Sequence, residues 1–174
     1  MEDASETSHR SDPIEQAERN WRRAGWPEAA DGMAAVTAVM RAQQLLLAQV
    51  EETLRPYALT FARYEVLMLL TLSRTGELPL ATVGSRLQVH PASVTGLVKR
   101  LEKDGLLTRR TDPDDARARR VSISDEGRAL ALRATAHLNE EVFAQGWISG
   151  PGGRELLRSL RSLRRAYGDL GEDD

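Results

Sequence analysis

The chain has 174 residues, of which 41% are hydrophobic and only 5% aromatic, a composition that favours packed helices with an aliphatic core. It contains no cysteine, which excludes disulfides, thiol catalysis and thiol-based redox sensing. The formal net charge of −2 hides an asymmetry, because residues 86–120 carry nine basic and five acidic side chains. The net charge of this segment is therefore +4 and that of the rest of the chain −6. Such a local excess of positive charge decides where a polyanion can dock.

The first part of the chain predicts a polar tail followed by a short helix and a long one. Residues 1–12 are polar and lack periodicity, so we expect them to be disordered. Pro13 opens a short helical stretch that ends at Gly25. We expect Asp31 to be the N-cap of a long amphipathic helix, which Pro56 stops.

The middle of the chain predicts three helices in close succession. Thr60 can cap the first, which we expect to end before Gly76, and a short extended link follows at residues 78–80. A second helix is expected over about residues 81–87, and a third from Pro91 to about residue 104. A short helix, a tight turn and another helix form a helix-turn-helix, whose last helix can enter the major groove of DNA.

The helix that begins at Pro91 has two different faces. At 100° per residue, Val94, Val98 and Leu101 share one side. The opposite side carries small, hydroxylated or cationic residues, which permit close approach to base edges and hydrogen bonds to bases or phosphates. An ordinary solvated helix face remains an alternative for this helix taken alone.

A basic β-hairpin is predicted directly after this helix. Two extended stretches, 107–110 and 119–124, flank a turn at residues 111–115, and arginines occupy both strands and the tip. Arginines on a thin projection can enter a narrow minor groove, and we expect Asp115 to hold the Arg117 guanidinium in place. The expected DNA contacts are Ser93, Thr95, Gly96, Lys99, Arg100, Lys103, Arg109, Arg110, Asp115, Arg117 and Arg119.

The last part of the chain predicts two more helices. One begins after Ser124, and the sequence Gly-Pro-Gly-Gly at residues 150–153 is expected to break the chain before the other. The final helix carries an apolar stripe that suits a seam between helices. Its members are Leu156, Leu160, Leu163 and Tyr167.

The stretch from His90 to Leu130 resembles the DNA-binding core of the multiple-antibiotic-resistance regulator (MarR) family, most specifically at residues 112–117 and 121–127. Residues 59–70 are similar to the second helix of that family, and the resemblance covers about residues 31–167. It implies a mainly α fold, a winged helix-turn-helix with a two-stranded β wing and N- and C-terminal dimerisation helices. The implied organisation is a tail at 1–12, dimerisation helices at 13–56, the winged helix-turn-helix at 57–125, further dimerisation helices at 126–170 and an acidic tail at 171–174.

The resemblance also implies how the protein works. It predicts a homodimer in which each winged helix reads one half of a palindrome in double-stranded DNA, commonly as a repressor, and which a small aromatic or anionic effector can release. The implied dimerisation residues are Val36, Met40, Leu47, Val50, Leu54, Leu156, Leu160, Leu163 and Tyr167. The residues implied for an effector site are Trp21, Arg22, Trp26, Met40, Arg63 and Tyr64.

Other classes of function have little support in the sequence. The three histidines, His9, His90 and His137, lack metal-ligand partners at usable spacing, so we expect no enzyme, no metal and no cofactor. The apolar runs are too short for a membrane span and no signal peptide is visible, so we expect a cytoplasmic protein. The alternative is a winged-helix module that binds a protein and does not read DNA sequence; its binding would depend on apolar anchors, whereas a DNA reader loses affinity steeply with salt.

Overall fold

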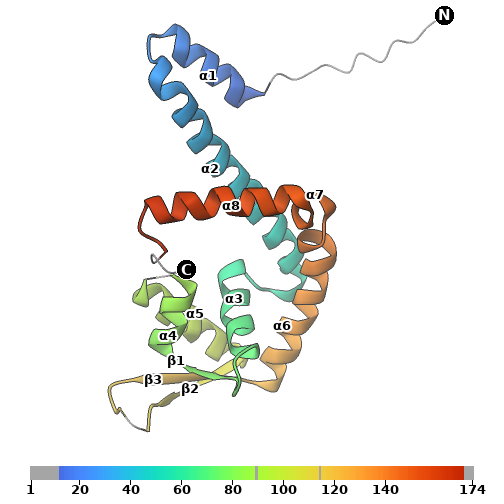
Figure 1. Ribbon diagram of the computed structural model, residues 1–174. Helices are drawn as coiled ribbons and strands as arrows, with labels where there is room; N and C mark the ends of the chain where they lie inside the picture. The colour runs from blue at the N-terminus through green and yellow to red at the C-terminus, as the bar shows by residue number, and fades with distance from the viewer. Residues whose placement is uncertain (1–11, 89, 114, 171–174) are drawn as a thin grey trace, which may run out of the picture. The chain divides into compact units, whose positions relative to one another are not determined.

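The computed structural model describes residues 12–88, 90–113 and 115–170 of the chain (Figure 1). They divide into two compact units, the first ending at Ala48 and the second beginning at Gln49. The expected tails at 1–12 and 171–174 lie outside the described residues, except for Asp12. In the part of the chain that the structure describes, no helix is both long and apolar enough to cross a membrane.

The first unit contains α1 (Pro13–Arg23) and most of α2 (Pro27–Leu54). Asp12 caps α1 by accepting the Ile14 N–H at 2.9 Å, so this residue of the expected tail is structural. The prediction that α2 begins after Asp31 was wrong, because the helix begins more than one turn earlier, at Pro27. Pro27 occupies the first helical position, where a missing N–H costs nothing, and the Asp31 carboxylate forms an ion pair with Arg22.

Four helices of the second unit surround one hydrophobic core: α3 (Phe61–Thr71), α4 (Leu80–Leu87), α5 (Pro91–Lys103) and α6 (Asp125–Leu138). The predicted cap at Thr60 is confirmed, since its hydroxyl accepts the Arg63 N–H. Ser124 caps α6 in the same way, accepting the Gly127 N–H at 2.9 Å. The core is built from aliphatic side chains with no exposure, among them Leu67, Leu70, Val83, Val98, Leu101 and Leu138.

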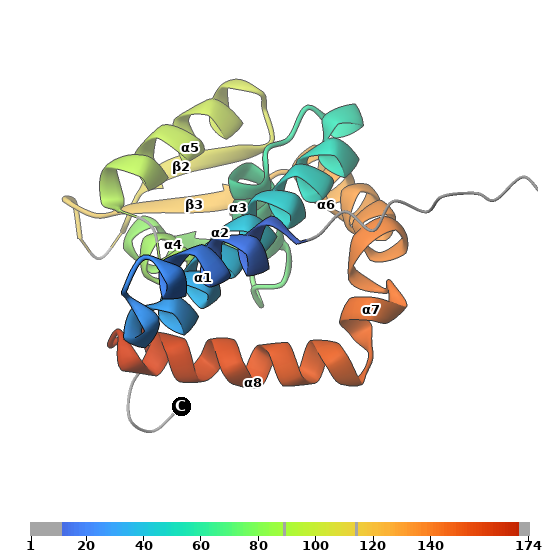
Figure 2. The same ribbon diagram turned by 90° about the horizontal axis from the view of Figure 1, so that it is seen from above.

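A small antiparallel sheet completes this unit, in the order β1-β3-β2. The predicted hairpin is confirmed as β2 (Leu107–Thr111) and β3 (Arg119–Ile123). The structure adds β1 (Glu77–Pro79) where the sequence predicts only an extended link, and β1 pairs with β3 so that Glu77 lies opposite Ser122. Its three residues and terminal proline suit an edge strand. The prediction of a mainly α winged helix-turn-helix is confirmed, and Figure 2 shows α5 alongside β2.

The C-terminal part of the second unit continues from α6 through a π-helical turn (Asn139–Phe143) into α7 (Gly146–Ser149) and α8 (Pro151–Ala166). The predicted break at residues 150–153 is shorter than expected, because only Gly150 lies between α7 and α8. Gly153 sits inside α8 and packs so closely on α7 that a Cβ there would lie 1.6 Å from the Ile148 carbonyl oxygen.

The expected dimerisation residues fall into two groups. Val50 and Leu54 are buried in the core of the second unit, because the end of α2 packs there, so the prediction that they form a dimer surface was wrong. The others keep part or most of their surface, Leu47 and Leu160 being half-buried. Those with large exposed side chains are Val36, Met40, Leu156, Leu163 and Tyr167.

The corner between α7 and α8 yields a stability prediction. Gly153→Ala should lower the free energy of unfolding by roughly 1–3 kcal/mol, since the added methyl group collides with backbone that cannot move aside easily. Gly152→Ala is the matched control, because its Cβ would meet nothing closer than the Trp147 carbonyl oxygen at 3.7 Å. That variant should be neutral or more stable by up to about 1 kcal/mol. Urea unfolding measures both, and equal effects would contradict the close packing.

Candidate nucleic-acid interface

Helix α5 presents a polar outer face on a firmly anchored inner face. Its first turn is capped by His90, whose Nδ1 accepts the Ala92 N–H at 3.3 Å. The predicted inner face is confirmed, since Val94, Val98 and Leu101 are at most 1% exposed. The outer residues are all exposed, namely Ser93, Thr95, Gly96, Lys99, Arg100 and Lys103. A Cβ at Gly96 would meet nothing within 4 Å, so the space above this position is open to a ligand.

The wing tip is shaped by backbone hydrogen bonds. The Asp112 N–H donates to the Ala118 carbonyl at 3.1 Å, and the Ala118 N–H donates to the Asp115 carbonyl at 2.9 Å. The Asp115 carboxylate accepts the backbone N–H of Arg117 at 2.8 Å. The prediction that Asp115 holds the Arg117 guanidinium was therefore wrong. Asp115 fixes the turn, which leaves that guanidinium exposed at the tip.

Strand register divides the wing arginines between two faces. Side chains alternate along a strand, so Arg109 and Arg119 share the face of the buried Leu107 and Val121, whereas Arg110 and Arg120 lie on the other. The Arg109 Nε donates to Glu102 at 2.6 Å. The Arg119 guanidinium donates to the carbonyls of Ala116 and Ala118, both at 3.1 Å, and no carboxylate among the described residues pairs with it.

A hollow of about 800 Å³ brings the wing and the helix-turn-helix together. Its lining comes from α4, the turn before α5, the first turns of α5 and the end of the hairpin. The residues that matter here are Ser85, His90, Thr95, Arg117 and Arg119. The two arginines of the tip and the first turns of α5 therefore face one common space, as a duplex-binding surface requires.

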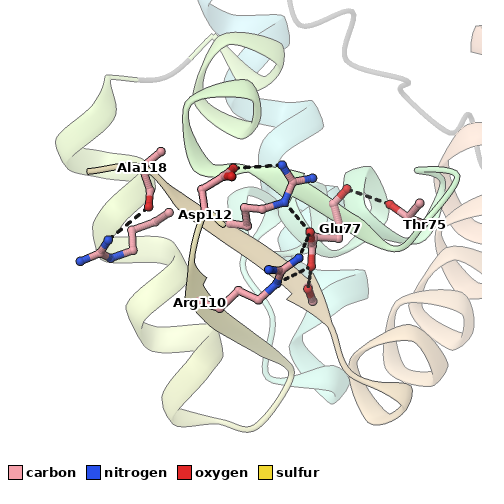
Figure 3. A network of polar contacts seen from close by, with 8 residues as sticks. Thr75, Glu77, Arg110, Asp112 and Ala118 are labelled. Carbon is pink, nitrogen blue, oxygen red and sulfur yellow. Dashed lines mark hydrogen bonds and ion pairs between the residues drawn. The ribbon is translucent and has the colours of Figure 1, made fainter. Parts of the chain in front are cut away.

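Glu77 on β1 is the residue that sequence reasoning missed. Each of its carboxylate oxygens accepts two hydrogen bonds (Figure 3). The donors are the Arg110 guanidinium at 2.8 and 3.0 Å, the Ser122 hydroxyl at 2.6 Å, and Arg120. These hydrogen bonds lower the pKa of Glu77 to about 2, and those from Arg110 have the largest effect. No sequence signal could have found it, since the partners lie 33 to 45 positions away.

The residues expected to form an effector site are divided between the two units. Trp21 and Trp26 meet edge to face in the first unit, with ring centroids 5.3 Å apart, and Trp21 lines a shallow hollow with Met33 and Val36. Arg22 is already paired with Glu18 and Asp31. Met40 is also in the first unit and is exposed.

The other two residues of this set lie in the second unit. Arg63 donates to the Ala58 carbonyl at 3.0 Å and pairs with Asp104. The Tyr64 hydroxyl lies 3.0 Å from that of Thr135. The Tyr64 hydroxyl and both terminal nitrogens of Arg63 are therefore engaged within their own unit, whereas the buried Arg63 Nε has no partner among the described residues.

Comparison with known proteins identifies the family. A model of the MarR family matches residues 61–118. The crystal structure of Sco5413, a MarR family transcriptional regulator from Streptomyces coelicolor, is 45% identical in sequence and superposes with a TM-score of 0.73, over 82% of this chain and 99% of that one. This chain belongs to the MarR family. It is a DNA-binding transcriptional regulator with a winged helix-turn-helix, as the resemblance in its sequence implies.

Two other proteins, one similar in sequence and one in structure, support this assignment to the family. The HTH-type transcriptional regulator SarZ of Staphylococcus aureus is 28% identical over 110 residues, which are 63% of this chain and 72% of SarZ. The transcriptional regulator MOSR of M. tuberculosis, solved in complex with DNA, shares the fold with a TM-score of 0.66 at 24% identity, covering 78% of this chain and 96% of that one.

The carboxylate of Glu77 yields a pH prediction. Its pKa is about 2 in the folded state against an ordinary value of 4.5, so its stabilising contribution is complete above pH 4.5 and is lost as the pH falls toward 2. The melting temperature of Glu77→Gln should therefore fall less than that of the wild type between about pH 6 and about pH 3. Glu155→Gln removes an exposed carboxylate on α8, and its melting temperature should fall by as much as that of the wild type. If the melting temperatures of all three proteins fell equally between these pH values, the result would contradict the role of Glu77.

Proposed function

We propose that the protein is a homodimeric repressor that binds a palindromic operator, with α5 in the major groove and the wing tip in the adjacent minor groove. The observation that carries this proposal is the common hollow, around which Arg117 and Arg119 of the wing and Thr95 of α5 are gathered. A helix that reads base edges beside an arginine that follows a narrow minor groove is a known way to bind duplex DNA. We propose no catalytic activity, and we expect the protein to act in the cytoplasm.

The exposed residues of α5 divide into two roles in this proposal. Thr95, Gly96 and Lys99 face the groove floor, where a small surface and a lysine can approach guanine acceptors. Ser93, Arg100 and Lys103 contact phosphates, which set register without reading sequence. Arg109 and Asp115 stabilise the shape of the wing, Arg109 through its pair with Glu102 and Asp115 through its bond to the Arg117 N–H.

The dimer is supported by the exposed apolar side chains on α8 and α2. Leu156 is 43% exposed, Leu163 42% and Tyr167 82%, although they form one stripe of a helix. Val36 and Met40 are 59% and 61% exposed. Apolar stripes of this kind are stable in water when a second copy covers them. Two reading helices of such a dimer would lie about 34–36 Å apart, one turn of DNA.

We further propose that a small aromatic molecule acts as the effector, binding beside Trp21 and Trp26 of the first unit. The exposed indole pair and the shallow hollow beside it support this proposal. Benzoate is a simple probe. It should quench tryptophan fluorescence saturably and reduce operator affinity, and Trp21→Ala should abolish both effects. Quenching that grows linearly without saturation would contradict a site.

Selection from random duplex DNA, followed by a salt titration of the selected sequence, tests the main proposal. A palindromic sequence bound by two chains, with affinity falling steeply with salt, is the expected result. Failure to enrich any sequence would favour the alternative, a winged-helix module that binds another protein through apolar anchors.

The wing tip yields a mutational prediction. Arg117→Ala should weaken operator binding several-fold, because it removes an exposed guanidinium from the tip, and should leave the dimer intact. Arg133→Ala, an exposed arginine on α6 outside the proposed interface, is the control and should bind normally. Fluorescence anisotropy measures affinity and sedimentation measures the dimer. Unchanged affinity of Arg117→Ala would show that the wing tip does not contact DNA.

A further inference from the structure

Two arginines of the wing are paired with carboxylates in the structure, so less positive charge is available to a ligand than the sequence suggests. Arg110 and Arg120 stand on the outer face of the hairpin together with Glu77 and Asp112. Arg110 is bound by Glu77, and Arg120 is bound by both Glu77 and Asp112, the latter at 3.1 Å. These four side chains, two arginines and two carboxylates, form the outer quartet, which has no net charge. Arg117 and Arg119 have no such carboxylate among the described residues.

The carboxylate at the centre of the outer quartet is well placed to hold both arginines. Glu77 projects from β1, the strand next to β3, and its side chain is only 16% exposed. Its two oxygens are fully occupied, and Arg110 is bound in the bidentate geometry that fixes a guanidinium plane most firmly. Arg110 itself is 54% exposed, so without this partner its long side chain would be free to swing toward a phosphate.

We propose that Glu77 limits the sequence-independent affinity of the wing by withholding Arg110 and Arg120 from DNA, so that the wing binds through Arg117 and Arg119 alone. This inference rests on the proposed function and refines it, because it removes Arg110 from the expected DNA contacts. Phosphate contacts add affinity for every sequence equally, whereas contacts within the grooves discriminate. Holding two mobile arginines on carboxylates therefore lowers the sequence-independent part of the affinity, so that groove contacts supply a larger share of what remains.

The test measures binding of the full chain to its selected operator and to a scrambled duplex over a range of salt concentrations. Glu77→Gln keeps the size of the side chain but cannot hold two guanidinium groups. It should tighten binding to the scrambled duplex several-fold and steepen the slope of log affinity against log salt by up to about 0.9, the value for one phosphate contact. Such a slope change means that the loss of affinity between about 50 and about 200 mM salt grows about 3.5-fold.

Two variants control for net charge and for the carboxylate itself. Glu126→Gln changes the net charge equally but removes an exposed carboxylate in the first turn of α6 that binds no described arginine, so its slope should match that of the wild type. Glu77→Asp keeps the negative charge and should restore most of the wild-type salt slope. An unchanged slope in Glu77→Gln, or an equal loss of affinity for both duplexes, would overturn the proposal and would leave Glu77 a structural residue only.

A second variant tests the same idea without removing Glu77. Arg110→Gln should leave the salt slope unchanged, because Arg110 is already withheld from phosphates. A slope shallower by about 0.9 would identify Arg110 as a phosphate contact and overturn the proposal. If the wild type itself shows no preference for any duplex, the proposed function fails, a result distinct from either of these.

Discussion

The burial of one face of α5 is the constraint on which the rest of the interface depends. Val98 and Leu101 belong to the same dry core as Leu107 of β2 and Val121 of β3, so helix and wing share a single anchor. Side chains in such a core are close-packed, and moving one element disturbs its neighbours. The outer face of α5 and the strands β2 and β3 of the wing are thus held at a fixed mutual position.

Features that depend on local sequence could be predicted, and those that depend on distant partners could not. Thr60 and Pro91 mark helix starts because capping and proline geometry act within one turn, and the spacing of Val94, Val98 and Leu101 revealed the inner face of α5. By contrast, β1 is too short to carry an alternating pattern, and it becomes a strand only because β3 lies beside it.

The candidate site shows the same division. The exposed face of α5 followed from helical periodicity, but the pairing of the wing arginines did not, because Glu77 meets Arg110 only after the sheet has formed. The sequence likewise placed Asp115 near Arg117 correctly but could not tell a backbone N–H from a guanidinium as its partner. The ion pairs on the wing therefore fix where each guanidinium is held, and local sequence carries no sign of them.

The open space above Gly96 has a consequence for how such a regulator can change. A side chain added there would meet nothing in the folded chain, and a glycine within a helix is destabilising by roughly 0.5–1 kcal/mol relative to alanine. Substitution at this position would therefore be favourable or neutral for the scaffold while altering what fits the groove. In the proposed DNA-binding mode, this position at the centre of the reading face carries no packing constraint, so new operator preferences could arise there by single changes that leave the core unaltered.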